Sequence, residues 1–344
     1  MIGAYLFTSL ALIHQLGSLL PCPLDAGWQL LWQLELPRQS AKGKPIGGFS
    51  GMQLNNNLQQ IILLSDSPTS YIVSANWHGS WLDPSWKIGE PELLQAAPDS
   101  PLDGEALLRV GSNWWMASEA RDPQIQPAEL LLLNPLPGPR FAIKQRFSLP
   151  HDWQPHADQG LLPNQGPEAL LAMPGGAFLL APERPLRQDP PTQLRLLLAK
   201  PSLKPDKTTS VQFTALSATL PYQPPDGAEA HWGLTELLRL NTGESLALWR
   251  GYQEPNKWWA QLELFAPIPL RENAQISLKP KAQWDLIKLG LTPDNWEAMG
   301  AGPRLADGRP TLLLASDDNF NPFQANRLAL LAPMRSTACS KGRP

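Results

Sequence analysis

The chain has 344 residues, of which 42% are hydrophobic and 17% are charged, so it can bury a sizeable core. Its formal net charge of −3 and the lack of a Lys/Arg cluster argue against nucleic-acid binding. The 38 prolines and 25 glycines are spread between short apolar runs, and long amphipathic helices are scarce. This pattern is typical of an all-β protein.

Residues 1–26 are predicted to be a signal peptide or an apolar leader. Residues 4–13 have the length of a secretory apolar region and are too short for a stable membrane span. The first basic residue is Arg38, so the usual positive flank is missing, and an apolar strand or helix is the alternative. A signal peptide would make the protein periplasmic or extracellular.

The two cysteines, Cys22 and Cys339, lie at opposite ends of the chain. A disulfide between them would require chain ends that meet and an oxidising compartment. Two unpaired cysteines in disordered ends are the alternative. The five histidines show no zinc-ligand spacing.

A unit of apolar strands recurs five times along the chain. In each unit a short strand near a glycine precedes an apolar strand with a polar tip, and a third apolar strand follows. The equivalent positions are 55, 63, 67 and 62 residues apart, at Ser50, Glu105, Glu168, Thr235 and Glu297. Radial repetition explains the recurring tips, because the inner strands of a propeller converge on one channel, whereas a β-sandwich does not predict them.

The predicted fold is therefore an all-β propeller over residues 27–334. We expect six blades, with five or seven as alternatives, because five units are visible and the long gaps and terminal strands could form a degenerate sixth. Residues 28–37 read as an outer strand that closes the propeller together with the C-terminal strand at 327–331. Residues 335–344 are predicted to be a disordered tail, and the protein is expected to be a monomer.

Four segments carry a resemblance to a known family, and they are Gly47–Gly51, Asn164–Leu170, Asp294–Ala298 and Ser316–Phe320. Through them the chain resembles the phytase-like family that is named for an esterase-like activity of phytase, a set of propeller-type domains of secreted bacterial proteins. The departures from the family pattern are Ala169, Ala298, Trp296 and Trp249, the last in place of an acidic residue. The resemblance implies a propeller with an esterase-like activity.

Acidic side chains occupy most of the repeated tips and would form a ring that includes Glu105. Crowded carboxylates repel one another, and a hard cation such as Ca²⁺ would relieve this by taking carboxylate and amide oxygens as ligands. The predicted Ca²⁺ ligands are Glu168, Glu183, Asp66, Glu119 and Asn295. The predicted catalytic residues are Glu297, Asp317 and Asp318. The residues predicted to bind a small anionic ester are Arg184, Arg250, Asn164 and Asn319.

Two functions remain open at this point. The first is a secreted, Ca²⁺-assisted phosphoesterase or esterase, and the second is a non-catalytic propeller that binds a ligand or a protein partner. In the second case the acids would accept backbone hydrogen bonds from the neighbouring blade. A serine-esterase mechanism at Ser50 is disfavoured, because no histidine lies near it in the pattern and no Gly-x-Ser-x-Gly elbow exists.

Overall fold

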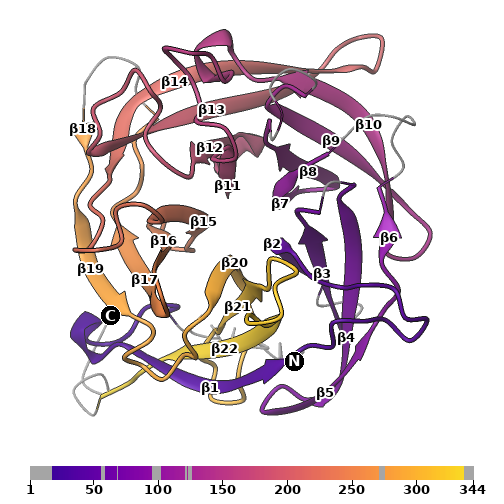
Figure 1. Cartoon of the computed structure of the whole chain (residues 1–344), viewed down its shortest axis with the longest axis vertical. Coiled ribbons are helices and arrows are strands. Elements are labelled where there is room, and N and C mark those ends of the chain that lie inside the picture. The colour runs from indigo at the N-terminus through magenta and orange to yellow at the C-terminus, as the bar shows by residue number, and fades with distance from the viewer. Residues whose placement is uncertain are drawn as a thin grey trace, which may run out of the picture.

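The computed structural model describes residues 18–55, 59–67, 69–94, 102–120, 122, 126–270 and 276–336. Over these residues the chain forms five sheets, antiparallel except for one short edge strand, that stand around a central axis as the blades of a propeller (Figure 1). The prediction of an all-β propeller is confirmed. The prediction of six blades is wrong.

Each blade runs from an inner strand to an outer strand. Blade 1 contains β2 (Phe49–Asn55), β3 (Gln60–Ser65), β4 (Tyr71–Ser80) and β5 (Asp83–Ile88), with β6 (Glu92–Leu93) beside β4. Blade 2 contains β7 (Gly104–Val110), β8 (Asn113–Ser118), β9 (Glu129–Leu136) and β10 (Arg140–Ser148). Blade 3 contains β11 (Pro167–Ala172), β12 (Phe178–Pro182), β13 (Gln193–Leu203), β14 (Thr209–Pro221) and the parallel edge strand β18 (Ile276–Ser277).

Blades 4 and 5 complete the ring. Blade 4 contains β15 (Gly233–Arg239), β16 (Ser245–Gln253), β17 (Lys257–Phe265) and β19 (Pro280–Asp285). Blade 5 contains β20 (Asn295–Ala301), β21 (Leu312–Asp317), β22 (Arg327–Pro333) and β1 (Trp28–Glu35). Short 3₁₀ turns lie at Leu24–Ala26, His151–Trp153 and Pro174–Gly176.

The segments expected to build a sixth blade belong to the five blades instead. The N-terminal strand β1 pairs antiparallel with β22 and is the outer strand of blade 5. The long gap after the third unit is filled by β13 and β14, which have 11 and 13 residues and extend blade 3 outward. Strand pairing between distant segments, which the spacing of the repeats does not report, therefore set the number of blades.

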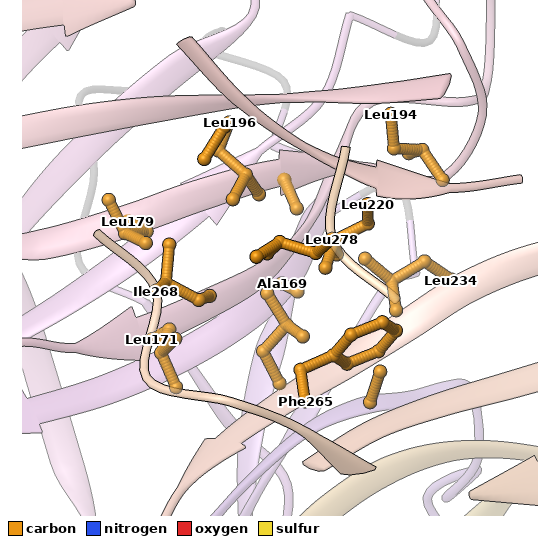
Figure 2. Packing of buried hydrophobic residues seen from close by; sticks show 14 of the residues in the cluster. Ala169, Leu171, Leu179, Leu194, Leu196, Leu220, Leu234, Phe265, Ile268 and Leu278 are labelled. Carbon is orange, nitrogen blue, oxygen red and sulfur yellow. The ribbon is translucent and has the colours of Figure 1, made fainter. Parts of the chain in front are cut away.

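The core lies between the blades. The described hydrophobic residues form five clusters, and each cluster joins two neighbouring blades. In β21, Leu312 and Leu314 pack toward blade 4 while Leu313 and Ala315 pack toward blade 1, because successive side chains of a strand point to opposite faces. Burial on both faces explains the continuous Leu/Ala runs of the sequence. Figure 2 shows the cluster between blades 3 and 4, which includes Phe265.

Each of the five inner strands carries a β-bulge at the repeated position. The pairing register shifts between Phe49 and Gly51, and equivalent shifts occur in the other four inner strands. The residues at the shifts are Ser50, Glu105, Glu168, Thr235 and Glu297. The inner strands contact one another in the closed order β2, β7, β11, β15, β20. A bulge re-aims a side chain, so the repeat read from the sequence is a ring around the axis.

The ends of the described chain lie side by side. The Cys22 amide donates a hydrogen bond to the Met334 carbonyl over 3.1 Å, and Cys22 forms an isolated β-bridge with Arg335. Cys339, most of the predicted leader and most of the predicted tail lie outside the described residues. Within the described part, no helix is both long and apolar enough to cross a membrane.

Candidate functional site

Two of the acidic tips join one blade to the next. Glu119 directly follows β8, and its Oε2 accepts a hydrogen bond of 2.7 Å from the Gly166 amide at the start of blade 3. Asp318 follows β21, and its Oδ1 accepts a hydrogen bond of 3.2 Å from the Gly48 amide of blade 1. A Cβ atom added to Gly166 would lie 2.1 Å from Glu119 Cβ, so the contact requires glycine. These acids therefore have an architectural role between blades.

Three carboxylates of blade 2 lie close together, next to its inner strand β7. Ligand oxygens of Asp103, Glu105 and Glu119 all lie within 4.8 Å of one another, and all three side chains are buried. Burial, followed by repulsion from Asp103, raises the pKa of Glu119 to about 8. Burial and the neighbouring charges of Glu168 and Glu119 raise the pKa of Glu105 well above its usual value. The cluster therefore favours a proton or a bound cation.

The donor set suits a hard cation. Oxygen ligands bound at 2.3–2.6 Å to one Ca²⁺ lie at most about 5 Å apart, and the three carboxylates meet that condition. Ca²⁺ prefers oxygen ligands such as carboxylates, whereas softer metals prefer sulfur or imidazole ligands. Asp103, Glu105 and Glu119 can therefore hold a divalent cation, with Glu119 still bonded to the neighbouring blade.

Arg250 neutralises the opposite side of the ring. Its Nε lies 3.2 Å from Glu297 Oε1, and its Nη1 lies 3.2 Å from Glu183 Oε1. Burial opposes the charge of the guanidinium, but the attraction of Glu183 and Glu297 outweighs it and raises the pKa of Arg250 above its usual value. Arg250, which the sequence predicts to bind substrate, is thus engaged by two carboxylates.

A second network links blade 5 to this ion pair. The Asn295 side-chain amide donates to Glu297 Oε1 over 2.9 Å and to Asp317 Oδ2 over 3.2 Å. Burial raises the pKa of Asp317 well above its usual value, and the charges of Glu297 and Asp66 add to the effect. Burial also raises the pKa of Glu297, although Arg250 opposes that shift. The predicted residues Glu297, Asp317 and Asn295 therefore lie together.

The chain matches one family model over residues 44–320, the phytase-like model described as "Esterase-like activity of phytase". The chain belongs to the phytase-like family. No curated protein matches it.

Among solved structures, the phytase-like chain is similar to several distant propellers. An exo-β-1,3-galactanase from Clostridium thermocellum is 12% identical with a TM-score of 0.49, and the match covers 87% of this chain and 61% of that one. An exo-β-1,3-galactanase from Phanerochaete chrysosporium is 11% identical with a TM-score of 0.46, covering 87% and 64%. A glucose dehydrogenase is 10% identical with a TM-score of 0.42, covering 89% and 100%. The chain spans less than two thirds of the length of these galactanases.

The remaining predicted residues take different places in this phytase-like propeller. The charge of Asp66, after β3, contributes to the raised pKa of both Glu105 and Asp317. Among the described contacts, no hydrogen bond or ion pair joins Arg184 or Asn164 to the acids. The Arg184 guanidinium donates to the Ala230 carbonyl, and Asn164 is exposed before β11.

The sequence predicts Glu119 as a ligand and places Glu105 in the acidic ring, but it gives no role to Asp103. The Glu119 amide donates to the Asp103 carbonyl over 2.9 Å, and Ser118 Oγ accepts a hydrogen bond of 3.1 Å from the Asp103 amide. These bonds between β7 and β8 place Asp103 beside the other two acids. Its position directly before Gly104 in the repeated unit was the available signal.

Proposed function

We propose that this phytase-like propeller is a Ca²⁺-dependent phosphoester hydrolase that acts on small anionic esters at its central channel. The observation that carries the proposal is the buried cluster of Asp103, Glu105 and Glu119, whose ligand oxygens lie within 4.8 Å of one another. A bound cation would supply the positive charge that holds and polarises a phosphate oxygen in an otherwise acidic channel. We further propose a secreted, monomeric protein.

The other acids would handle the proton. Burial raises the pKa of Asp317 well above its usual value, so of the acids in this network it is our candidate to donate a proton to a leaving alcohol. Glu297 lies beside the Arg250 guanidinium, which opposes the rise in its pKa and makes it the better base for a water molecule. Asn295 donates to both carboxylates and sets their spacing. Asp318 acts as a positioning residue, because its Oδ1 accepts two backbone hydrogen bonds.

The groups that would meet the substrate lie around this network. Asn319 and Asn164 are exposed and can donate amide hydrogen bonds to an ester oxygen. Arg184 is directed toward the carbonyl of Ala230 and can supply a charge at the rim. Arg250 would act mainly on Glu297, because its own charge is already balanced.

The test is hydrolysis by the purified full chain of a panel of phosphomonoesters and carboxylic esters, with Ca²⁺ or with chelator. We expect turnover of phosphomonoesters that disappears with chelator and in the variants Glu105→Gln and Asp317→Asn. Asp83→Asn, on the exposed outer strand β5, is the matched control and should keep full activity. Turnover that persists in chelator, or in both variants, would contradict the proposal.

A non-catalytic propeller is the second candidate. The observation that favours it is the use of Glu119 and Asp318 as acceptors for amides of the neighbouring blade. If this candidate is correct, no ester of the panel is turned over, and Glu119→Gln only lowers the temperature of unfolding. The acidic ring would then serve to fix one blade against the next.

A further inference from the structure

The segment after β21 exposes two phenylalanines. Phe320 is 46% exposed and Phe323 is 93% exposed, whereas most large apolar side chains of the described chain are buried. In Figure 1 the connection between β21 and β22, drawn in yellow, lies near the start of β2. Single exposed apolar side chains are common on protein surfaces, so it is the backbone conformation and the neighbours of Phe320 that set it apart.

The backbone holds Phe320 in an unfavourable conformation. Asn319 and Phe320 have φ values of 47° and 50°, in the left-handed region that a phenylalanine seldom adopts. The Asn319 amide donates to Asp317 Oδ1 over 2.7 Å, and the Phe320 amide donates to Asp318 Oδ1 over 3.1 Å. Strain of this kind persists only where the surrounding contacts enforce it, and here two buried carboxylates do so.

The Phe320 ring lies beside the acidic residue Asp66, above Gly48. A Cβ atom added to Gly48 would lie 2.9 Å from Phe320 Cε2 and 2.2 Å from Asp66 Oδ1. The ring edge and the Asp66 carboxylate therefore share one small space over Gly48. A glycine is required there, because the left-handed φ of 66° and both neighbours exclude a side chain.

We propose that Phe320 is a substrate-binding platform that stacks on a flat apolar ring in the alcohol part of the ester, so that aryl phosphomonoesters are the preferred substrate class. The inference rests on the proposed function. Aromatic rings bind flat ring faces by offset or edge contacts. Phe320 would thus select the alcohol while the cation and the acids act on the phosphate.

Charge also favours a substrate with a single phosphate. A polyphosphorylated polyol needs several free cationic side chains to balance it. Among the described ion pairs of the channel acids, the cations are Arg38, held by Asp318, and Arg250, held by Glu183 and Glu297. Arg184, which donates to the Ala230 carbonyl, adds one cation at the rim. A single phosphate matches this small supply of positive charge better than several phosphates do, so a monoester with an apolar ring fits the site better.

The test is calorimetric titration of the full chain in Ca²⁺ with phenylphosphonate and with methylphosphonate, which share the headgroup and differ in the ring. We expect the wild type to bind phenylphosphonate more tightly, and Phe320→Ala to weaken phenylphosphonate binding about three- to tenfold while leaving methylphosphonate unchanged. Phe320→Tyr should retain the ring preference. Phe323→Ala, from the same loop, is the matched control and should behave as the wild type.

Several results would overturn the platform. The wild type could bind both phosphonates equally tightly, or bind neither. Phe320→Ala could weaken the binding of both phosphonates by the same factor. Phe323→Ala could weaken phenylphosphonate binding as much as Phe320→Ala does. Because binding needs no turnover, the two proposals fail separately. Ring-selective binding without ester hydrolysis would support the platform and contradict the hydrolase. Ca²⁺-dependent hydrolysis in which Phe320→Ala affects aryl and alkyl phosphates alike would do the reverse.

Discussion

Replacing Arg250 with methionine tests whether one guanidinium balances the acidic ring. The Arg250 side chain is 20% exposed, and its partners Glu183 and Glu297 are 6% and 9% exposed. Removing one partner from a buried ion pair leaves an uncompensated charge and costs about 3–5 kcal/mol. Since Arg250 contacts two carboxylates, we expect Arg250→Met to lower the free energy of unfolding by at least the lower figure at pH 8.

The loss should depend on pH. Burial already raises the folded-state pKa of Glu297, and without the Arg250 guanidinium, which opposes that shift, this pKa would rise further. The folded variant then binds more protons than the unfolded chain, so its stability is highest at low pH and falls as pH rises above the ordinary pKa of a glutamate. We therefore expect a markedly smaller deficit, relative to wild type, at pH 5.

The assay is guanidinium unfolding of the wild type and Arg250→Met in chelator at pH 5 and pH 8. Arg250→Lys should be intermediate, because one ammonium keeps the charge but cannot reproduce the two contacts made by separate nitrogens. Arg140→Met, on the exposed start of β10, is the control and should be close to neutral. A deficit below about 1 kcal/mol, or one equal at both pH values, would refute the reasoning.

Three further predictions concern the blade contacts and the cation cluster. Gly166→Ala places a methyl group 2.1 Å from Glu119 Cβ and should lower the free energy of unfolding, measured by thermal unfolding, by about 1–3 kcal/mol. In the control Gly300→Ala, the new Cβ would meet only a methyl group 3.7 Å away, and the loss should stay below about 1 kcal/mol. Equal losses in the two variants would contradict the prediction. Ca²⁺ must displace the proton of Glu119, whose pKa is about 8, so calorimetry should show the Ca²⁺ affinity rising about tenfold per pH unit between pH 6 and 8. The raised pKa of Glu105 should add to this slope. A Ca²⁺ affinity that stays constant with pH would count against the cluster. Asn295→Ala leaves two buried acids without their shared amide donor and should lower the free energy of unfolding, measured with denaturant, by about 1–3 kcal/mol. An unchanged free energy of unfolding would contradict this prediction and would show that water replaces the amide.

The sequence by itself determined the kind of fold. Glycines, prolines and short apolar runs are local signals, and their recurrence at Ser50, Glu105 and Glu297 places one bulged inner strand in each blade. The segment Ser316–Phe320, with the rest of the resemblance, was enough to indicate the phytase-like family that residues 44–320 match. These features depend on neighbours in the chain, so a pattern can report them.

Tertiary structure alone decided the number of blades and the grouping of the charges. The pairing of β1 with β22 joins segments about 300 residues apart, and no local pattern shows that they complete a fifth blade instead of starting a sixth. The same holds for Asp103, which enters the cluster through bonds between two strands, and for Arg250, whose partners come from two other blades. Spacing along the chain shows which acids can face the axis. Which of them keep a charge to offer a cation depends on distances across blades, because both desolvation and Coulomb interactions act through space.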